Sequence, residues 1–122
     1  MPRPDMVDTV PMALAWEDLV SFAATLPETE ESTSYNTPAL KVANKLIARL
    51  RAEAEGGVVV MCSLEEKEAL LASPGSAYYT TDHYDGHGSI IVDLDRADAT
   101  EVQELLTEAW RAKAPKRALK RL

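Results

Sequence analysis

The feature that most limits the fold of this chain is a change in hydrophobic period near residue 35. Before it, six apolar residues recur at helical spacing and form one stripe: Trp16, Leu19, Val20, Phe22, Ala23 and Leu26. After it, apolar and polar residues alternate over residues 40–51, which is the period of a β-strand. Separate segments with these two periods are typical of an α+β domain, in which helices pack on a sheet.

The alternation over residues 40–51 predicts a β-hairpin. Asn44-Lys45 is expected to form its turn, because Asn tolerates a positive φ. Two sets of side chains would lie on opposite faces of the second strand, the apolar Leu46, Ala48 and Leu50 and the mostly basic Lys45, Ile47, Arg49 and Arg51. We therefore expect one face against the core and a basic face toward solvent.

Three further segments indicate strands. Residues 58–62 form a short β-branched run that suits a central strand, and residues 78–81 and 89–94 also have high β propensity. The acidic segment 28–34 has no period and is expected to be a loop.

Two pairs of residues have the spacing of a capping box and predict the starts of helices. Ser63 with Glu66 opens a helix that runs to about Ala72, and Asp98 with Glu101 opens the last long helix. The apolar stripe of that last helix comprises Val102, Leu105, Leu106, Ala109 and Trp110. The tail after Pro115 is expected to add a basic helical turn.

The predicted fold class is α+β, with a mostly antiparallel sheet and helices packed around it. Residues 1–14 contain three prolines and are expected to be a flexible lead-in, and residues 15–122 are expected to form a single domain.

Composition also indicates the cellular compartment. The one cysteine, Cys62, has no partner for an internal disulfide, which favours a reducing compartment. No apolar run approaches the ~20 residues of a membrane span, and the first residues lack the pattern of a secretory signal. We expect a cytoplasmic protein without a membrane partner.

The sequence contains none of the common catalytic motifs, such as GxSxG, HExxH, a P-loop or GxGxxG. Both histidines, His83 and His87, lie in the loop 82–88, where imidazole and carboxylate groups would suit a divalent metal. Gly86 and Gly88 in the same segment argue against a helix that would align the two rings. We expect no catalytic residue, no metal and no cofactor.

Several strings resemble the MmcQ/YjbR family. They are SYNTPALKV at residues 34–42, NKLIARL at residues 44–50, TDHY at residues 81–84, and Trp110 followed by APKR at residues 114–117. They occur in the expected order and span nearly the whole chain. Two positions depart from the family pattern, since Asn36 replaces a usual Gly and Leu40 replaces a usual aromatic residue.

The resemblance implies a "double wing" α+β fold, related in shape to the frataxin-like arrangement. Members of the family are commonly labelled DNA-binding proteins by analogy of fold, which is weak support for a function. The loss of an aromatic at Leu40 removes a side chain that could stack on a base.

The residue pattern suggests one surface for DNA or another nucleic acid. The hairpin supplies Lys41, Lys45, Arg49 and Arg51, and the C-terminal tail supplies Lys116 and Arg117. These cations could follow a phosphate backbone if the two segments meet in space. The net charge of −7 opposes this function, and a solvated outer sheet face is the alternative interpretation.

A second hypothesis is a module that binds a small molecule, a peptide or another protein. It would use the turn that contains Tyr35 and Thr37, together with Asp82, His83 and Tyr84. A third hypothesis is an enzyme of an unrecognised class in which His83 acts as a general acid or base. Cys62 precedes a helix, a position that can activate a thiol, but its apolar strand favours an inert buried group. The oligomeric state is left open.

Overall fold

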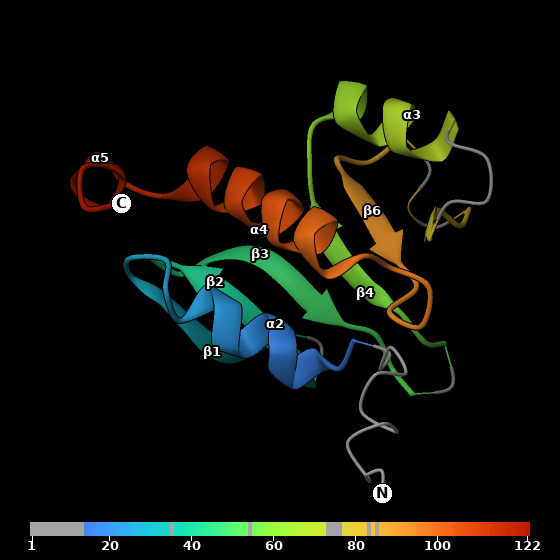
Figure 1. The fold of residues 1–122 in the computed structure, drawn as a ribbon, viewed down its shortest axis with the longest axis horizontal. Helices are drawn as coiled ribbons and strands as arrows, with labels where there is room; N and C mark the ends of the chain where they lie inside the picture. The colour runs from blue at the N-terminus through green and yellow to red at the C-terminus, as the bar shows by residue number, and fades with distance from the viewer. Residues whose placement is uncertain (1–13, 35, 54, 73–76, 83, 85) are drawn as a thin grey trace, which may run out of the picture.

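The computed structural model describes residues 14–122 except 35, 54, 73–76, 83 and 85 (Figure 1). The predicted lead-in of residues 1–14 lies almost wholly outside the described residues. The helices are α2 (Trp16–Ala23), α3 (Leu64–Ala72), α4 (Ala99–Lys113) and α5 (Lys116–Leu119). The strands are β1 (Thr29–Ser34), β2 (Thr37–Val42), β3 (Lys45–Leu50), β4 (Val58–Met61), β5 (Tyr78–Tyr79) and β6 (Ser89–Val92).

The strands form one six-stranded sheet in the order β1-β2-β3-β4-β6-β5. Every pairing recorded between neighbouring strands is antiparallel. β4 lies between β3 and β6, as the β-branched run at residues 58–62 predicts. The predicted α+β class with an antiparallel sheet is confirmed.

α2 and α4 cover one face of this sheet, while α3 lies beside β5 and β6 (Figure 1). The predicted stripe of α4 is buried in full, at Val102, Leu105, Leu106, Ala109 and Trp110. These residues pack on core residues from the strands, which include Leu40, Val42, Ala48, Val60 and Ile90. The amphipathic pattern of α4 therefore correctly predicts which helix face is buried against the core.

The segment expected to be a loop, residues 28–34, instead contains strand β1. β1 pairs with β2 along its whole length, from Thr29 opposite Val42 to Ser34 opposite Thr37. Edge strands are held by backbone hydrogen bonds on one side and need few apolar side chains. The prediction was wrong because a hydrophobic pattern cannot reveal a polar strand at the edge of a sheet.

The hairpin is present, but its turn and its faces differ from the prediction. Ala43 and Asn44 have φ values of 48° and 68°, so they form the turn, and Lys45 begins β3. Leu40 pairs with Ala48 while Lys41 pairs with Leu46, so Ile47 is the extra residue of a β-bulge. Ile47 is consequently in the core and not on the basic face. The strict alternation predicted for residues 45–51 is therefore wrong between residues 46 and 47.

The predicted helix starts are confirmed. The Ser63 hydroxyl accepts a hydrogen bond from the backbone N–H of Glu66 at 3.0 Å, and the Asp98 carboxylate accepts one from Glu101 at 3.0 Å. The basic tail forms the short helix α5, also as predicted.

Candidate functional site

The sheet face opposite α2 and α4 carries a row of side chains in register across four strands. Arg49 of β3 pairs with Val59 of β4, Val59 pairs with Ile91 of β6, and Ile91 pairs with Tyr79 of β5. Leu50, Val60 and Val92 are the next residues on β3, β4 and β6, and they lie in or against the core beneath α2 and α4. Because successive side chains of a strand point to opposite faces, the row that contains Arg49 faces away from that core. Arg49 is thus placed on a sheet face that α2 and α4 leave open.

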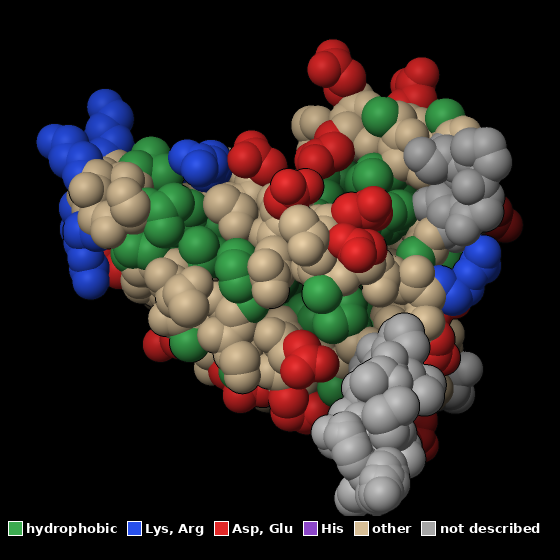
Figure 2. All heavy atoms as spheres, in the orientation of Figure 1, with side chains coloured by type: hydrophobic (Ala, Val, Ile, Leu, Met, Phe, Trp, Pro, Cys, Tyr) green, Lys and Arg blue, Asp and Glu red, His purple; other side chains and the backbone are tan. Residues whose placement is uncertain are grey.

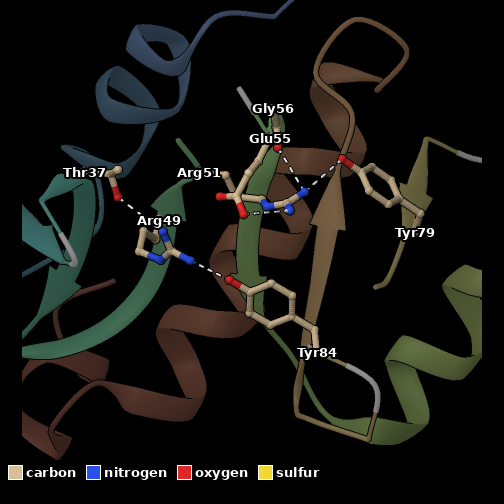
Figure 3. A network of polar contacts seen from close by, with 7 residues as sticks. All are labelled: Thr37, Arg49, Arg51, Glu55, Gly56, Tyr79 and Tyr84. Carbon is tan, nitrogen blue, oxygen red and sulfur yellow. Dashed lines mark hydrogen bonds and ion pairs between the residues drawn. The ribbon is translucent and has the colours of Figure 1, made fainter. Parts of the chain in front are cut away.

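Arg49 links two segments that are distant in sequence (Figure 3). Its guanidinium donates one hydrogen bond to the Thr37 hydroxyl at 3.4 Å and another to the Tyr84 hydroxyl. The Thr37 hydroxyl in turn donates to the backbone carbonyl of Ser34 at 2.9 Å. Arg49 therefore joins the β1–β2 turn to the loop that follows β5.

Arg51 lies beyond the end of β3 and is almost enclosed, with its side chain 9% exposed. Its guanidinium donates to the Gly56 carbonyl at 3.1 Å and to the Tyr79 hydroxyl at 3.4 Å, and it pairs with the Glu55 carboxylate at 3.6 Å (Figure 3). Its Nε–H is buried without a hydrogen-bond partner. These contacts fix the orientation of the Arg51 guanidinium, which lies on the same side of the sheet as Arg49.

A buried lysine of α3 binds the loop that carries Tyr84. Lys67 of α3 is 3% exposed, and its ammonium donates to the backbone carbonyls of Tyr84 at 2.6 Å and His87 at 2.9 Å. Because a buried ammonium that lost these acceptors would be left unpaired at a large cost in free energy, the carbonyls of Tyr84 and His87 are anchored to α3.

These elements enclose an open cleft of about 680 Å³, which we call the arginine cleft. Its lining residues are Thr37, Arg49, Arg51, Ala52, Glu55, Thr81, Asp82 and Tyr84. The described residues of both segments named by the small-ligand hypothesis, Thr37 on one side and Asp82 and Tyr84 on the other, line this one cleft. Tyr35 and His83 lie outside the described residues.

The six cations predicted to form one basic surface do not lie together. Arg49 and Arg51 line the arginine cleft, whereas Lys45 lies at the other end of β3, next to the hairpin turn. Lys41 lies between them on β2, opposite Glu30 of β1. The continuous basic hairpin face expected from alternation is therefore not formed.

The hairpin turn and the C-terminal tail both contact Glu28. The backbone N–H of Ala43 donates to the carbonyl of Glu28 at 3.4 Å, and the Glu28 carboxylate binds Arg117 at 2.7 Å and Arg121 at 3.7 Å. We call this region the basic end and define it by Lys45, Lys116, Arg117, Lys120 and Arg121. Figure 2 shows Lys and Arg side chains gathered over α5, while carboxylates are spread over much of the remaining visible surface.

The hydrogen bond from Arg117, together with the positive charges of Arg117 and Arg121, lowers the pKa of Glu28 below its usual value. The basic end therefore contains a firmly ionised carboxylate that neutralises part of its charge.

Cys62 is half-buried at the end of β4. Burial and, next, the nearby Glu66 carboxylate raise the pKa of its thiol to about 11. A thiol with this pKa is almost wholly protonated at neutral pH and is a poor nucleophile, which agrees with the expected inert role. Within the described residues, no group of three or more His, Cys, Asp and Glu side chains has an arrangement that could hold a metal ion.

Sequence reasoning missed three residues that build the cleft: Glu55, Lys67 and Tyr79. Tyr79 and Glu55 take part only because the chain folds back beside Arg51, and no local pattern marks them. For Lys67 the one available signal is its place on α3, three residues from the half-buried Leu70. A lysine there is more simply interpreted as part of a solvated face.

The geometry defines an α+β protein with a polar cleft on the face of an antiparallel sheet that lies opposite α2 and α4. The YjbR family model matches residues 24–112, and the chain belongs to this family. The resemblance seen in the sequence is thereby confirmed.

Several proteins are similar to this chain. The uncharacterized proteins Rv2570 of Mycobacterium tuberculosis and Mb2600 of Mycobacterium bovis are each 29% identical over 115 residues, covering 83% of this chain and 89% of theirs. The crystal structure of Deinococcus radiodurans protein DR2400, a DUF419 domain, matches with a TM-score of 0.71 and 20% identity. That match covers 92% of this chain and 89% of the other, and it supports the fold. In the described part of the chain, none of the helices is long and apolar enough to cross a bilayer.

Proposed function

We propose that the chain is a binding module for a small anionic ligand, which the arginine cleft holds. The observation that carries this proposal is the meeting of Arg49 and Arg51 with the hydroxyls of Thr37 and Tyr84 around one open cleft (Figure 3). Guanidinium groups bind carboxylates and phosphates through two parallel N–H donors, so they suit an anion better than a neutral ligand.

The existing contacts support a role in binding because they orient the two cations in advance. Arg49 donates to the hydroxyls of Thr37 and Tyr84, and these contacts fix the plane of its guanidinium. Arg51 is held by Gly56, Tyr79 and Glu55. A ligand that meets side chains already in place loses less affinity to side-chain ordering.

The proposal is tested by titrating the protein with inorganic phosphate, acetate and citrate, using calorimetry at low salt. We expect saturable binding of at least one anion, and we expect Arg49→Met to weaken it at least tenfold, because a bidentate charged contact is lost. Lys45→Met is the matched control, since it removes the same charge from the far end of β3 and should leave the affinity unchanged.

Two results would count against this function. One is the absence of saturable binding for all three anions. The other is an equal loss of affinity in Arg49→Met and Lys45→Met, which would indicate general charge attraction and not a site.

Binding of nucleic acid remains a second candidate, now at the basic end and not along the hairpin. It is favoured by Glu28, which contacts both the hairpin turn and Arg117, and by the exposure of Lys45, Lys116 and Lys120. Phosphate contacts of this kind depend steeply on salt. A labelled DNA duplex should therefore bind at about 50 mM salt and dissociate as the salt concentration rises.

The variant Lys116→Met/Lys120→Met separates this candidate from the first. It should weaken DNA binding and leave anion binding at the arginine cleft unchanged, whereas Arg49→Met should do the reverse. If neither a duplex nor a single strand binds at about 50 mM salt, the nucleic-acid function should be abandoned.

The proposed role is binding without catalysis, in the cytoplasm. The raised pKa of Cys62 supports a role without catalysis, because the protonated thiol is a poor nucleophile. The single cysteine in the sequence supports a reducing compartment.

A further inference from the structure

A second hollow of about 490 Å³ adjoins the arginine cleft on the same face of the sheet. We call it the apolar hollow, and its lining residues are Leu46, Arg49, Val59, Met61, Tyr84, His87 and Ser89. Arg49 and Tyr84 line both spaces, so the hydrogen bond between them stands at the boundary. The two hollows therefore form two compartments of one continuous surface.

The two compartments differ in chemistry. Aliphatic side chains of β3 and β4 line the apolar hollow, with the ring of Tyr84 at its boundary. The arginine cleft, in contrast, is lined by Thr37, Arg51, Glu55 and Asp82 among others. Ligand sites commonly combine a mostly apolar wall with a few placed polar groups, and a volume of about 300–1,000 Å³ suits a small organic molecule.

The β-bulge in β3 produces this arrangement. Because Ile47 is the extra residue, Leu46 lies opposite Lys41 and turns toward the same face as Arg49. Under strict alternation Leu46 would point into the helix-covered core with Ala48. The bulge thus moves one aliphatic side chain beside the guanidinium of Arg49.

We infer that the ligand of this site is an organic anion with an apolar body, such as a short-chain or aromatic carboxylate or phosphate monoester. Its charged group would lie against Arg49 in the arginine cleft, and its apolar body would lie in the apolar hollow against Leu46, Val59 and Met61. This inference rests on the proposed anion-binding function and specifies the class of ligand.

The experiment compares acetate with hexanoate, and inorganic phosphate with phenyl phosphate, by calorimetry on the full chain. Hexanoate should bind roughly fiftyfold more tightly than acetate, the ratio that burial of about three methylene groups gives. Phenyl phosphate should likewise exceed phosphate. Arg49→Met should weaken both members of each pair.

Leu46→Ser tests the apolar hollow itself. It should reduce the hexanoate-to-acetate ratio at least fivefold. Leu71→Ser, which removes an exposed leucine from α3, is the matched control and should preserve the ratio. If Leu46→Ser does not fold, Met61→Gln serves instead, and methyl chemical shifts of Val59 on addition of hexanoate give an independent measurement.

The outcomes separate this inference from the proposed function. If no anion binds saturably to the unmodified protein, both are overturned. If acetate and hexanoate bind with equal affinity, or if Leu46→Ser weakens them equally, anion binding stands and the inferred ligand class is wrong.

Discussion

Arg49 and Tyr84 lie 35 residues apart in sequence and are joined by a hydrogen bond from the guanidinium to the phenolic hydroxyl. This bond connects the central hairpin to the loop after β5. Lys67 donates hydrogen bonds to two backbone carbonyls of the same loop. It lies at the boundary of the arginine cleft and the apolar hollow, so its strength bears on both.

The first prediction concerns this bond. Arg49→Met and Tyr84→Phe should each destabilise the fold, and in a double-mutant cycle they should couple by about 1–2 kcal/mol, as expected for a charged hydrogen bond. Urea unfolding of the four proteins measures the coupling. Tyr78→Phe is the control partner, because Tyr78 donates to Glu101 on α4 and should not couple to Arg49.

A second prediction compares two neighbouring glycines. Both have positive φ, 73° at Gly56 and 82° at Gly57, so alanine is strained at each by about 1–2 kcal/mol. A Cβ at Gly57 would also lie 2.8 Å from Ile91 Cγ2 and 2.9 Å from the Tyr79 hydroxyl, whereas a Cβ at Gly56 has no atom within 4 Å. Gly57→Ala should therefore cost about 2 kcal/mol more than Gly56→Ala in urea unfolding. Equal losses of stability in the two variants would show that the structure accommodates a Cβ at Gly57 without additional cost.

The third prediction uses the thiol of Cys62. A pKa of about 11, against an ordinary 9.0, implies about a hundredfold less thiolate at pH 8 than in the unfolded chain. Alkylation by iodoacetamide at pH 8 should therefore be slower in the folded protein than in urea, and it should accelerate up to about pH 11. Glu66→Gln should speed the reaction, because it removes a negative charge that raises the pKa, while Glu68→Gln should not. A folded protein that reacts as fast as the protein in urea would contradict this account.

The fourth prediction concerns pH and the pair formed by Glu28 and Arg117. The pKa of Glu28 is lowered in the folded protein, chiefly by the hydrogen bond from Arg117, so the pair stabilises the fold above about pH 4.5. This contribution should be lost as the pH falls through the folded-state pKa. Stability of the wild type relative to Arg117→Met, measured by urea unfolding from pH 3 to 7, should follow this course. Lys120→Met, which removes a neighbouring charge that does not act on Glu28, should show no such dependence.

Local patterns in the sequence predicted most of the core. The stripe of α4, the central strand β4 and the caps at Ser63 and Asp98 all follow from the spacing of side chains along one segment. Each is a local property, because helical period, β-branching and capping depend on residues within a few positions of one another.

The candidate site was predictable only in part. Thr37, Asp82 and Tyr84 were identified as possible ligand residues, and the structure places them with Arg49 in one cleft. The sequence instead predicts a place for Arg49 on a basic surface for nucleic acid, with a solvated sheet face as the alternative. Whether Arg49 is exposed or held depends on Tyr84, which approaches it only through the packing of the loop on α3.

The amino-acid sequence by itself determined the α+β class, the family and the faces of the long helix, since these depend on side-chain periods and on short motifs. The tertiary structure alone decided that residues 29–34 pair as an edge strand, that a bulge turns Leu46 toward Arg49, and that the cations separate into a cleft and a basic end. The physical reason is that strand pairing, register and side-chain burial are set by partners distant in the chain, which no local pattern of residues specifies.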